Sequence, residues 1–259
     1  MSVEEDWPLI IDLMSEIISP TYCIVILEIF SYNEVNLRLF LYRQEWINLL
    51  QTNLSLTLSD ICIERAEHIL CQQLNYSLKS GHLYRILGEN GAGKTSLLKV
   101  ISGILMPLEG RVIVDNSHDQ DDQDDQDDQD TLIKNSLYLG HRYGIKSHLS
   151  VLENVTCYCP QASNEKIKRV LLHLKLYSYQ HSLVKHLSEG QRKRVALARL
   201  WLSDKAIWLL DEPLASLDKD GVALLEAKFQ EHINSGGLIV LTSHQELLSV
   251  SVKTIELLS

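Results

Sequence analysis

A glycine-rich loop that ends in a lysine and a threonine has the clearest chemical potential in the chain. Its pattern, Gly-x4-Gly-Lys-Thr, runs from Gly88 to Thr95. Such glycines let backbone N–H groups curl around phosphates, the lysine pairs with the β and γ oxygens, and the threonine hydroxyl is a ligand for Mg²⁺. Apolar residues at 82–87 and an amphipathic run at 96–101 indicate a strand before the loop and a helix after it. We therefore expect a nucleotide site formed by Gly88, Glu89, Asn90, Gly91, Ala92, Gly93, Lys94, Thr95 and Ser96.

Two further apolar runs end in side chains that suit the hydrolysis of a phosphate bond. Residues 206–210 precede Asp211-Glu212, and residues 237–242 precede His244. In open α/β sheets such sites form at the carboxyl ends of the strands. We expect Asp211 to act on the Mg²⁺ shell, Glu212 to polarise the attacking water as general base, and His244 to hydrogen-bond the γ-phosphate. Acids that merely cap a strand end are the alternative interpretation.

The pentapeptide Leu187-Ser-Glu-Gly-Gln191 indicates a second anion site. Ser188 and the flexible Gly190, followed by an apolar helical run, present a hydroxyl, backbone N–H groups and a helix N-terminal dipole to an anion. Because the chain already has one phosphate loop, a second anion site predicts a split active site.

The elements that position these residues follow from the hydrophobic periodicity. Alternating apolar residues predict a small antiparallel sheet early in the chain, and the later alternation of strands and helices predicts a parallel sheet. The fold class is therefore α/β. The expected strands are 54–58, 61–63, 74–78, 82–87, 110–115, 135–140 (as a buried strand), 206–210 and 237–242, and the expected helical segments are 148–185 and 221–234.

Composition is that of an ordinary globular protein, with 45% hydrophobic and 22% charged residues. The formal net charge is −10, but the repeat DQDDQDDQDDQD at 119–130 holds eight aspartates, and removing their charge leaves −2. Since no basic stripe is present to neutralise phosphates, nucleic acid is not expected as a partner. Like charges repel one another, so 116–131 is expected to be a solvated, low-complexity loop insertion, with a calcium site as the alternative.

The cysteines indicate a reducing cytoplasm, since their spacing gives no disulfide framework and acids stand where a secretory signal would have lysines. Cys157-x-Cys159 supplies only half of a zinc-type ligand set. Residues 1–53 contain apolar stretches interrupted by charges, and neither reaches the roughly 18 apolar residues of a membrane span. We expect a poorly ordered extension there, with an amphipathic docking segment as the alternative.

Five motifs in order, GENGAGKT (88–95), LSEGQ (187–191), LLDEP (209–213), ASLD (215–218) and Ser243-His244, resemble the ATP-binding subunits of ABC transporters. The resemblance covers about 55–259. It implies an ABC-type P-loop NTPase domain at 54–259, with a RecA-like parallel-sheet core, a small antiparallel β subdomain and a helical signature subdomain at about 148–190. It also implies an ATPase that uses ATP and Mg²⁺.

The same resemblance implies partners. Two copies would stack head to tail as a homodimer, so that Ser188, Gly190 and Gln191 contact ATP held by the other copy. Asp218 would couple the two sites. His141 would take the place of a glutamine that reaches Mg²⁺ and senses an integral membrane permease.

Several segments resemble a narrower family, the CcmA-type ATPase subunits of cytochrome c maturation, once described as haem exporters. This implies a permease of the CcmB type, a peripheral location on the cytoplasmic face of the inner membrane, and either haem export or release of a haem chaperone. The segments are LGH (139–141), GIK (144–146), LSVLEN (149–154), RVALARLWL (194–202) and the short tail after His244.

Three positions depart from the wider ABC pattern. His141 would make coupling to the permease pH-sensitive. Arg65 lies near the position where an aromatic ring usually stacks on adenine, and its guanidinium would stack there by a cation–π contact. Glu189 replaces the first glycine of the signature pair and adds negative charge near the partner's γ-phosphate.

The alternative function is that of a soluble ABC-type ATPase in translation or DNA repair. Such proteins usually carry two cassettes or a long coiled-coil insertion. A nucleotide-sensing scaffold would need a broken site, whereas Lys94, Asp211, Glu212 and His244 are all present.

Overall fold

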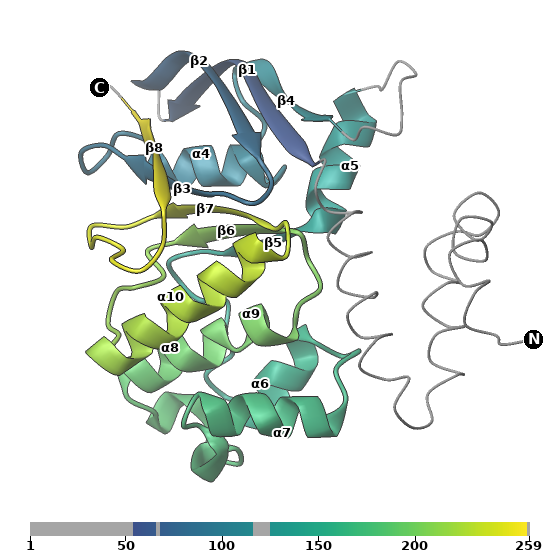
Figure 1. Cartoon of the computed structure of the whole chain (residues 1–259), viewed down its shortest axis with the longest axis vertical. Helices are drawn as coiled ribbons and strands as arrows, with labels where there is room; N and C mark the ends of the chain where they lie inside the picture. The colour runs from purple at the N-terminus through teal and green to yellow at the C-terminus, as the bar shows by residue number, and fades with distance from the viewer. Residues whose placement is uncertain (1–53, 66–67, 116–124, 258–259) are drawn as a thin grey trace, which may run out of the picture. The chain divides into compact units, whose positions relative to one another are not determined.

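A five-stranded sheet forms the centre of the described part of the chain (Figure 1). The computed structural model describes residues 54–65, 68–115 and 125–257. The strand order is β5-β6-β7-β3-β8, and every neighbouring pair is parallel, which confirms the predicted parallel sheet. The strands are β3 (Leu83–Leu87), β5 (Ser136–Leu139), β6 (Ile207–Asp211), β7 (Leu238–Thr242) and β8 (Val252–Glu256).

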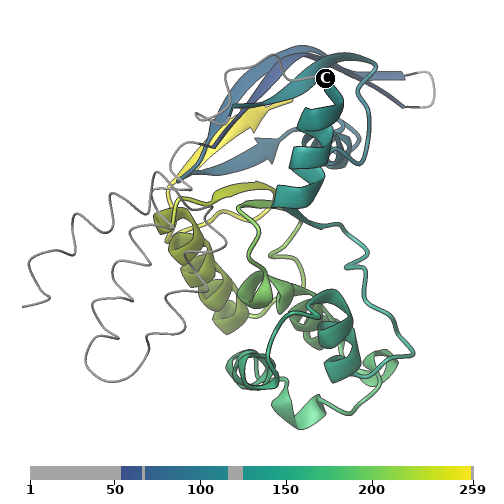
Figure 2. The same cartoon turned by 90° about the vertical axis from the view of Figure 1, so that its right-hand side faces the viewer.

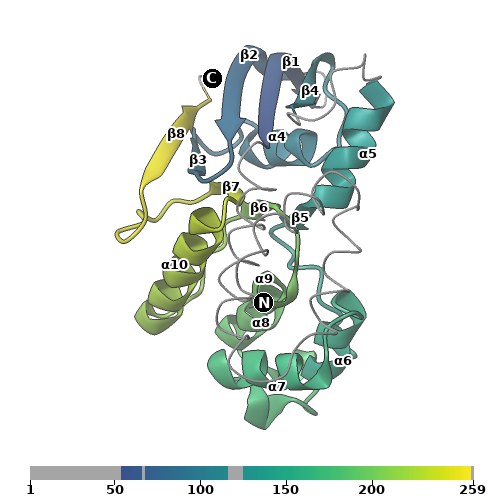
Figure 3. The ribbon, with the colours of Figure 1, turned by 45° about the vertical axis from the view of Figure 1, so that its right-hand side comes forward.

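Both faces of the central strands are covered, which explains why β6 and β7 read as continuous apolar runs. Leu209 and Val240 share one core with helix α4 (Lys94–Ile101). Trp208 and Ile239 point to the opposite face and pack with helix α10 (Lys219–Asn234). Figure 3 shows α4 between the two sheets and α10 on the other side of β6 and β7. Residues on the two faces of one strand therefore belong to two different cores.

The predicted antiparallel sheet is also confirmed. It consists of β1 (Ser55–Arg65), β2 (His68–Lys79) and β4 (Glu109–Asp115) in the order β2-β1-β4. Its buried residues, such as Leu56 and Leu78, pack on α4 in the same core as β6 and β7. This sheet thereby holds α4, and with it the glycine-rich loop, against the parallel sheet.

A helical region with its own core lies between β5 and β6. Figures 1 and 2 show α6 and α7 on the side of the parallel sheet that faces away from the antiparallel sheet. Val155 of α6, Leu171 of α7 and Val195 of α8 meet in this separate core. The elements are α6 (Val151–Tyr158), α7 (Asn164–His173), the short 3-10 turns η1 (Tyr177–Tyr179) and η2 (Val184–His186), α8 (Glu189–Leu197) and α9 (Arg199–Leu202).

The acidic repeat is not wholly a loop, and the expectation of a loop over 116–131 is wrong for its second half. Helix α5 (Asp125–Asn135) includes the last residues of the repeat. Tertiary contacts explain this helix, because Leu132 is buried and the Gln129 side chain donates a hydrogen bond to the Gly103 carbonyl at 2.8 Å.

The two edge strands differ from expectation. β8 was not predicted, because only Ile255 among its residues is buried and its pattern is short and polar. β5 was expected to be buried, but it lies at the sheet edge and only Leu139 is buried. An edge strand has a neighbouring strand on one side only, so fewer of its side chains are buried and its sequence lacks a continuous apolar run.

The extension predicted at residues 1–53 lies outside the described residues, as does the 119–124 part of the repeat. Within the described ranges, no helix has the length and apolar character needed to cross a membrane.

Candidate functional site

The glycine-rich loop connects the end of β3 to the start of α4. Gly88, Gly91 and Gly93 all have positive φ angles, a region that side chains with a Cβ rarely enter. At Gly93 the space is also closed, since an added Cβ would lie 3.0 Å from the Cβ of Leu70 on β2. The loop thus needs glycine for its conformation and for the close approach of β2.

Lys94 folds back over this loop. Its ammonium donates hydrogen bonds to the carbonyls of Gly88 at 2.6 Å and Glu89 at 3.0 Å. These are weak partners for a full positive charge, and the N–H groups at the start of α4 point in the same direction. The arrangement offers an anion the Lys94 ammonium together with the backbone N–H groups at the start of α4.

Asp211 brings the loop and the acidic strand end together. Its carboxylate is only 5% exposed and accepts hydrogen bonds from the Thr95 hydroxyl at 2.9 Å and the Thr242 hydroxyl at 2.8 Å. The two predicted Mg²⁺-binding residues, distant in sequence, therefore touch. One carboxylate and one hydroxyl form a hard-oxygen set that suits Mg²⁺, which usually takes its other oxygens from water and phosphate.

Glu212 and His244 face each other at the same sheet edge. The backbone N–H of His244 donates to Glu212 Oε2 at 3.4 Å, and the ring atom Nε2 of His244 lies 3.6 Å from Glu212 Oε1. The imidazole is exposed, whereas the Glu212 side chain is 20% exposed. A carboxylate and an imidazole so placed can hold one water between them and the phosphate loop.

Thr242 joins both acids and was not singled out from the sequence. Besides donating to Asp211, its hydroxyl accepts a hydrogen bond from the Glu212 N–H at 2.9 Å. Glu212 has a φ of 51°, a left-handed conformation that is uncommon for a residue with a side chain. Thr242 therefore helps to hold the left-handed turn at Glu212 and, at the same time, fixes the carboxylate of Asp211.

Lys193 of α8 supports the same turn through the Glu212 carbonyl, and it was not singled out from the sequence. Its side chain is buried, its ammonium donates to the Glu212 carbonyl at 2.7 Å, and it lies 4.3 Å from the centre of the Tyr143 ring. Burial lowers the pKa of Lys193 to about 8, an effect that nearby Glu212, Asp211 and Glu189 oppose. A lysine within the run Gln-Arg-Lys-Arg gave no signal in the sequence that distinguished it from its neighbours.

The signature pentapeptide forms the start of α8. Ser188 is the N-cap residue, and its hydroxyl accepts a hydrogen bond from the Gln191 N–H at 3.3 Å while the Gln191 side chain accepts one from the Ser188 N–H at 2.9 Å. A Cβ on Gly190 would lie 3.1 Å from the Ser216 carbonyl, so a glycine fits closely here. The predicted anion site is thus a capped helix start.

Glu189, the departure from the family pattern, is paired rather than free. Its carboxylate lies 2.9 Å from the Arg192 guanidinium one turn later. Burial and a hydrogen bond with Glu189 raise the pKa of Tyr143, so the Tyr143 hydroxyl is a second polar contact of this side chain. These contacts offset the negative charge that Glu189 brings to the signature.

Asp218 is the N-cap residue of α10 and forms a two-pronged ion pair. Arg194 of α8 donates to both of its carboxylate oxygens, at 2.7 and 2.8 Å, and the Gly221 N–H donates at 2.9 Å. The hydrogen bonds from Arg194 and Gly221 lower the pKa of this carboxyl. The residue predicted to couple two sites therefore ties the signature helix to α10.

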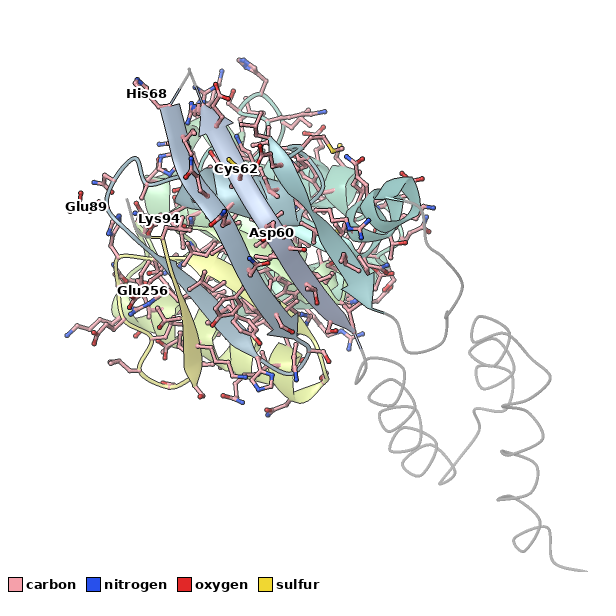
Figure 4. The ribbon with its side chains drawn as sticks, turned by 90° about the horizontal axis from the view of Figure 1, so that it is seen from above. Asp60, Cys62, His68, Glu89, Lys94 and Glu256 are labelled. Carbon is pink, nitrogen blue, oxygen red and sulfur yellow. The ribbon has the colours of Figure 1, made fainter. Side chains whose placement is uncertain are left out.

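Two predicted residues are placed near the site without a contact that defines their role. His141 follows β5, the neighbour of β6, and is exposed. Arg65 ends β1 opposite His68 at the tip of the β1–β2 hairpin. Figure 4 shows His68 at that tip, and Glu89 and Lys94 lie on the same side of the molecule. The roles proposed for His141 and Arg65 stay predictions.

Among the described residues, no three His, Cys, Asp or Glu side chains cluster as a zinc or calcium site would need. Cys157 and Cys159 thus gain no further ligand there.

The chain is similar to known ATP-binding proteins. The sequence pattern of the ABC transporter family matches residues 71–215. Three proteins named "Cytochrome c biogenesis ATP-binding export protein CcmA" are similar over most of their length. The one from Tatumella citrea is 39% identical over 73% of this chain and 88% of its own. Those from Histophilus somni and Yersinia pestis are 40% and 41% identical, over 79% and 73% of this chain and 94% and 85% of theirs.

Solved structures agree on the fold. A putative ABC transporter ATP-binding protein from Pyrococcus furiosus has a TM-score of 0.64 at 22% identity, covering 78% of this chain and 97% of that one. A bacterial Atm1-family ABC exporter with ATP bound has a TM-score of 0.64 at 18% identity, covering 74% of this chain and 35% of that one. This α/β architecture, with one parallel and one antiparallel sheet, is therefore the one predicted from the motifs.

Proposed function

We propose that the chain, which belongs to the ABC transporter family and is an ATP-hydrolysing enzyme, couples hydrolysis to a membrane complex used in c-type cytochrome biogenesis. The observation that carries the proposal is the similarity, at 39% and 40% identity over 88% and 94% of the relatives' own length, to proteins named for export in cytochrome c biogenesis. The nucleotide-binding loop, acidic pair and histidine present in the chain support an active rather than a degenerate subunit.

In this proposal the residues of one copy bind ATP and prepare water for attack. Lys94 and the N–H groups at the start of α4 bind the β and γ phosphates, and Thr95 and Asp211 hold Mg²⁺. When bound, Mg²⁺ neutralises phosphate charge. Glu212 accepts the proton of the attacking water, and His244 orients that water and the γ-phosphate. The hydrogen bonds among Thr95, Asp211 and Thr242 support this division of roles.

A second copy completes the site. Ser188, Gly190 and Gln191 at the start of α8 would cover ATP held by the other copy, because a helix start that presents N–H groups and a hydroxyl suits a γ-phosphate. Asp218, bound to Arg194 of α8, would transmit this contact to α10. ATP would thereby join two copies in a homodimer, and hydrolysis would release them.

The membrane partner is proposed to be a permease of the CcmB type. The helical region from α6 to α8 and the exposed His141 would contact it at the cytoplasmic face of the inner membrane. The complex would either export haem or release a haem chaperone, and in both cases ATP hydrolysis would drive a rearrangement of the membrane complex.

Copurification tests the function as a whole. The chain is expressed with a CcmB-type permease, membranes are extracted with mild detergent, and the complex is isolated through a tag on the permease. We expect the chain to copurify in two copies, and a chain carrying His141→Ala to copurify more weakly. A chain that stays wholly soluble and copurifies with ribosomes or DNA-repair proteins would favour the soluble alternative instead.

A genetic test addresses cytochrome c biogenesis directly. In a bacterium that lacks its own CcmA-type ATPase, the wild-type chain should restore covalent haem attachment to c-type cytochromes, measured by haem staining. The Glu212→Gln chain should accumulate equally and fail to restore it. Restoration by both chains would show that hydrolysis at this site does not drive the process.

A further inference from the structure

We propose that Lys193 is a positioning residue for Glu212. Its buried ammonium fixes the main-chain carbonyl of Glu212, and with it the left-handed turn that aims the Glu212 carboxylate at His244. This inference rests on the catalytic role proposed above for Glu212, and the experiment below separates the two.

The geometry is specific. The Lys193 ammonium donates to the Glu212 carbonyl at 2.7 Å, and Lys193 is 3% exposed. Glu212 has a φ of 51°, and residues in sparsely populated conformations persist only when their surroundings hold them. The Thr242 hydroxyl accepts from the Glu212 N–H, and Lys193 binds the carbonyl of the same residue. The peptide groups on both sides of the Glu212 Cα are thus each held by one buried side chain.

A buried ammonium is a costly way to fill space. An apolar side chain of similar length would pack in the same position without losing hydration, and replacing buried charges by apolar groups often stabilises a protein. The Tyr143 ring covers Lys193 at 4.3 Å from its centre, which shields the ammonium from water. The acidic groups that face it are Glu212, Asp211 and Glu189. A charge kept here is therefore better explained by the carbonyl it holds than by packing.

The position of Lys193 also connects two parts of the site. Ser188 caps the helix on which Lys193 lies, and Glu212 follows strand β6. The hydrogen bond from the Lys193 ammonium to the Glu212 carbonyl joins this helix directly to the turn after β6. The arrangement links the site that senses the partner's nucleotide to the proposed general base of the same copy.

The experiment compares steady-state ATPase kinetics of Lys193→Met, Lys193→Arg and the control Lys253→Met. Lys253 also lies over a tyrosine ring, Tyr84, but it is exposed and on the edge strand β8, outside the residues assigned to the site. We expect Lys193→Met to lower kcat 10-fold or more, with KM for ATP changed less than 2-fold and an unchanged or higher melting temperature. Lys193→Arg, which keeps charged N–H donors, should retain more activity than Lys193→Met, and Lys253→Met should match the wild type.

A double-variant cycle separates a positioning role from an independent one. If Lys193 acts through Glu212, Lys193→Met should lower the single-turnover rate of the Glu212→Gln chain less than 2-fold. A further loss of 10-fold or more in that background would overturn the proposal, as would wild-type kcat in Lys193→Met. If Glu212→Gln alone keeps wild-type activity, the catalytic role of Glu212 fails, and this is recognised before any Lys193 variant is made.

If Lys193→Met does not fold, Lys193→Gln is used in its place. The amide keeps an N–H donor without the charge, so an intermediate kcat at unchanged KM is expected, and wild-type kcat would again overturn the proposal.

Discussion

Replacing Thr242 by valine should damage the site without leaving a cavity. Valine has nearly the same shape as threonine but lacks the hydroxyl. In the structure that hydroxyl is buried, donates to Asp211 at 2.8 Å and accepts from the Glu212 N–H at 2.9 Å. The substitution therefore leaves one carboxylate oxygen and one backbone N–H without their partner.

The magnitude follows from these two bonds. A hydrogen bond to a charged group contributes about 1.5–3 kcal/mol, and one between neutral groups contributes about 0.5–1.5 kcal/mol. The free energy of unfolding should thus fall by about 2–4 kcal/mol. For a domain of this size, each kcal/mol lowers the melting temperature by about 2–4 °C, so a decrease of about 5–15 °C is expected. The ATPase kcat should fall about tenfold, because the Glu212 turn loses one of its two supports.

Equilibrium urea unfolding without nucleotide, followed by ATPase assays, checks both values. Thr242→Ser keeps the hydroxyl and should lose less than half as much. Thr254→Val makes the same change at an exposed position on β8 of the same sheet and should lie within about 0.5 kcal/mol of the wild type. A Thr242→Val protein as stable and active as Thr254→Val would refute the reasoning.

Three further predictions follow from the structure. Glu212→Gln should bind ATP normally, lose nearly all hydrolysis and form an ATP-dependent dimer; a chain that stays monomeric in gel filtration with ATP argues against the dimer. Deleting residues 119–124, which the sequence predicts to be a solvated loop, should change ATPase activity less than twofold, because the length of such a loop affects closure entropy weakly. Extending the deletion through residue 130 should lower the free energy of unfolding by about 1 kcal/mol more, since Gln129 loses its bond to Gly103; equal urea midpoints for the two deletions would contradict this. Burial lowers the pKa of His232 to about 4, so the folded state resists protonation more than the unfolded state, whose pKa is about 6.5. Its contribution to stability is complete above pH 6.5 and is lost as the pH falls towards 4, at up to about 1.4 kcal/mol per pH unit. His232→Phe, which keeps a ring on Trp208, should remove that part of the slope, and an unchanged slope in urea titrations would count against it.

The chemistry of the site was readable from the sequence because each motif is short and contiguous. The glycines between Gly88 and Thr95 predict a phosphate-binding loop between a strand and a helix. The apolar runs before Asp211 and His244 are long enough to predict buried strands. The parallel sheet and the antiparallel sheet were therefore expected, and the structure bears them out. The hydrogen bond between Thr95 and Asp211 agrees with the prediction that both residues serve one Mg²⁺ site, which stays a prediction.

Weak or conflicting local signals explain the errors. The acidic repeat was expected to be a loop throughout, since repulsion among aspartates is a local property. The packing of Leu132 and Gln129, which favours a helix from Asp125 onward, involves residues far away in sequence. β8 was missed for a similar reason, because it is an edge strand with one buried residue and is defined by its pairing with β3.

By itself, the sequence predicted which residues would bind phosphate and metal, and it determined the α/β class with one antiparallel and one parallel sheet. Only the tertiary structure decided how Glu212 is held. Thr242 arrives from a neighbouring strand and Lys193 from the signature helix, and nothing in the spacing of either residue marks it. The physical reason is that hydrogen bonds between elements depend on where the elements pack, and packing is set by the shared cores rather than by local pattern. The left-handed turn at Glu212 persists because those long-range contacts hold it, not because its own residues favour it.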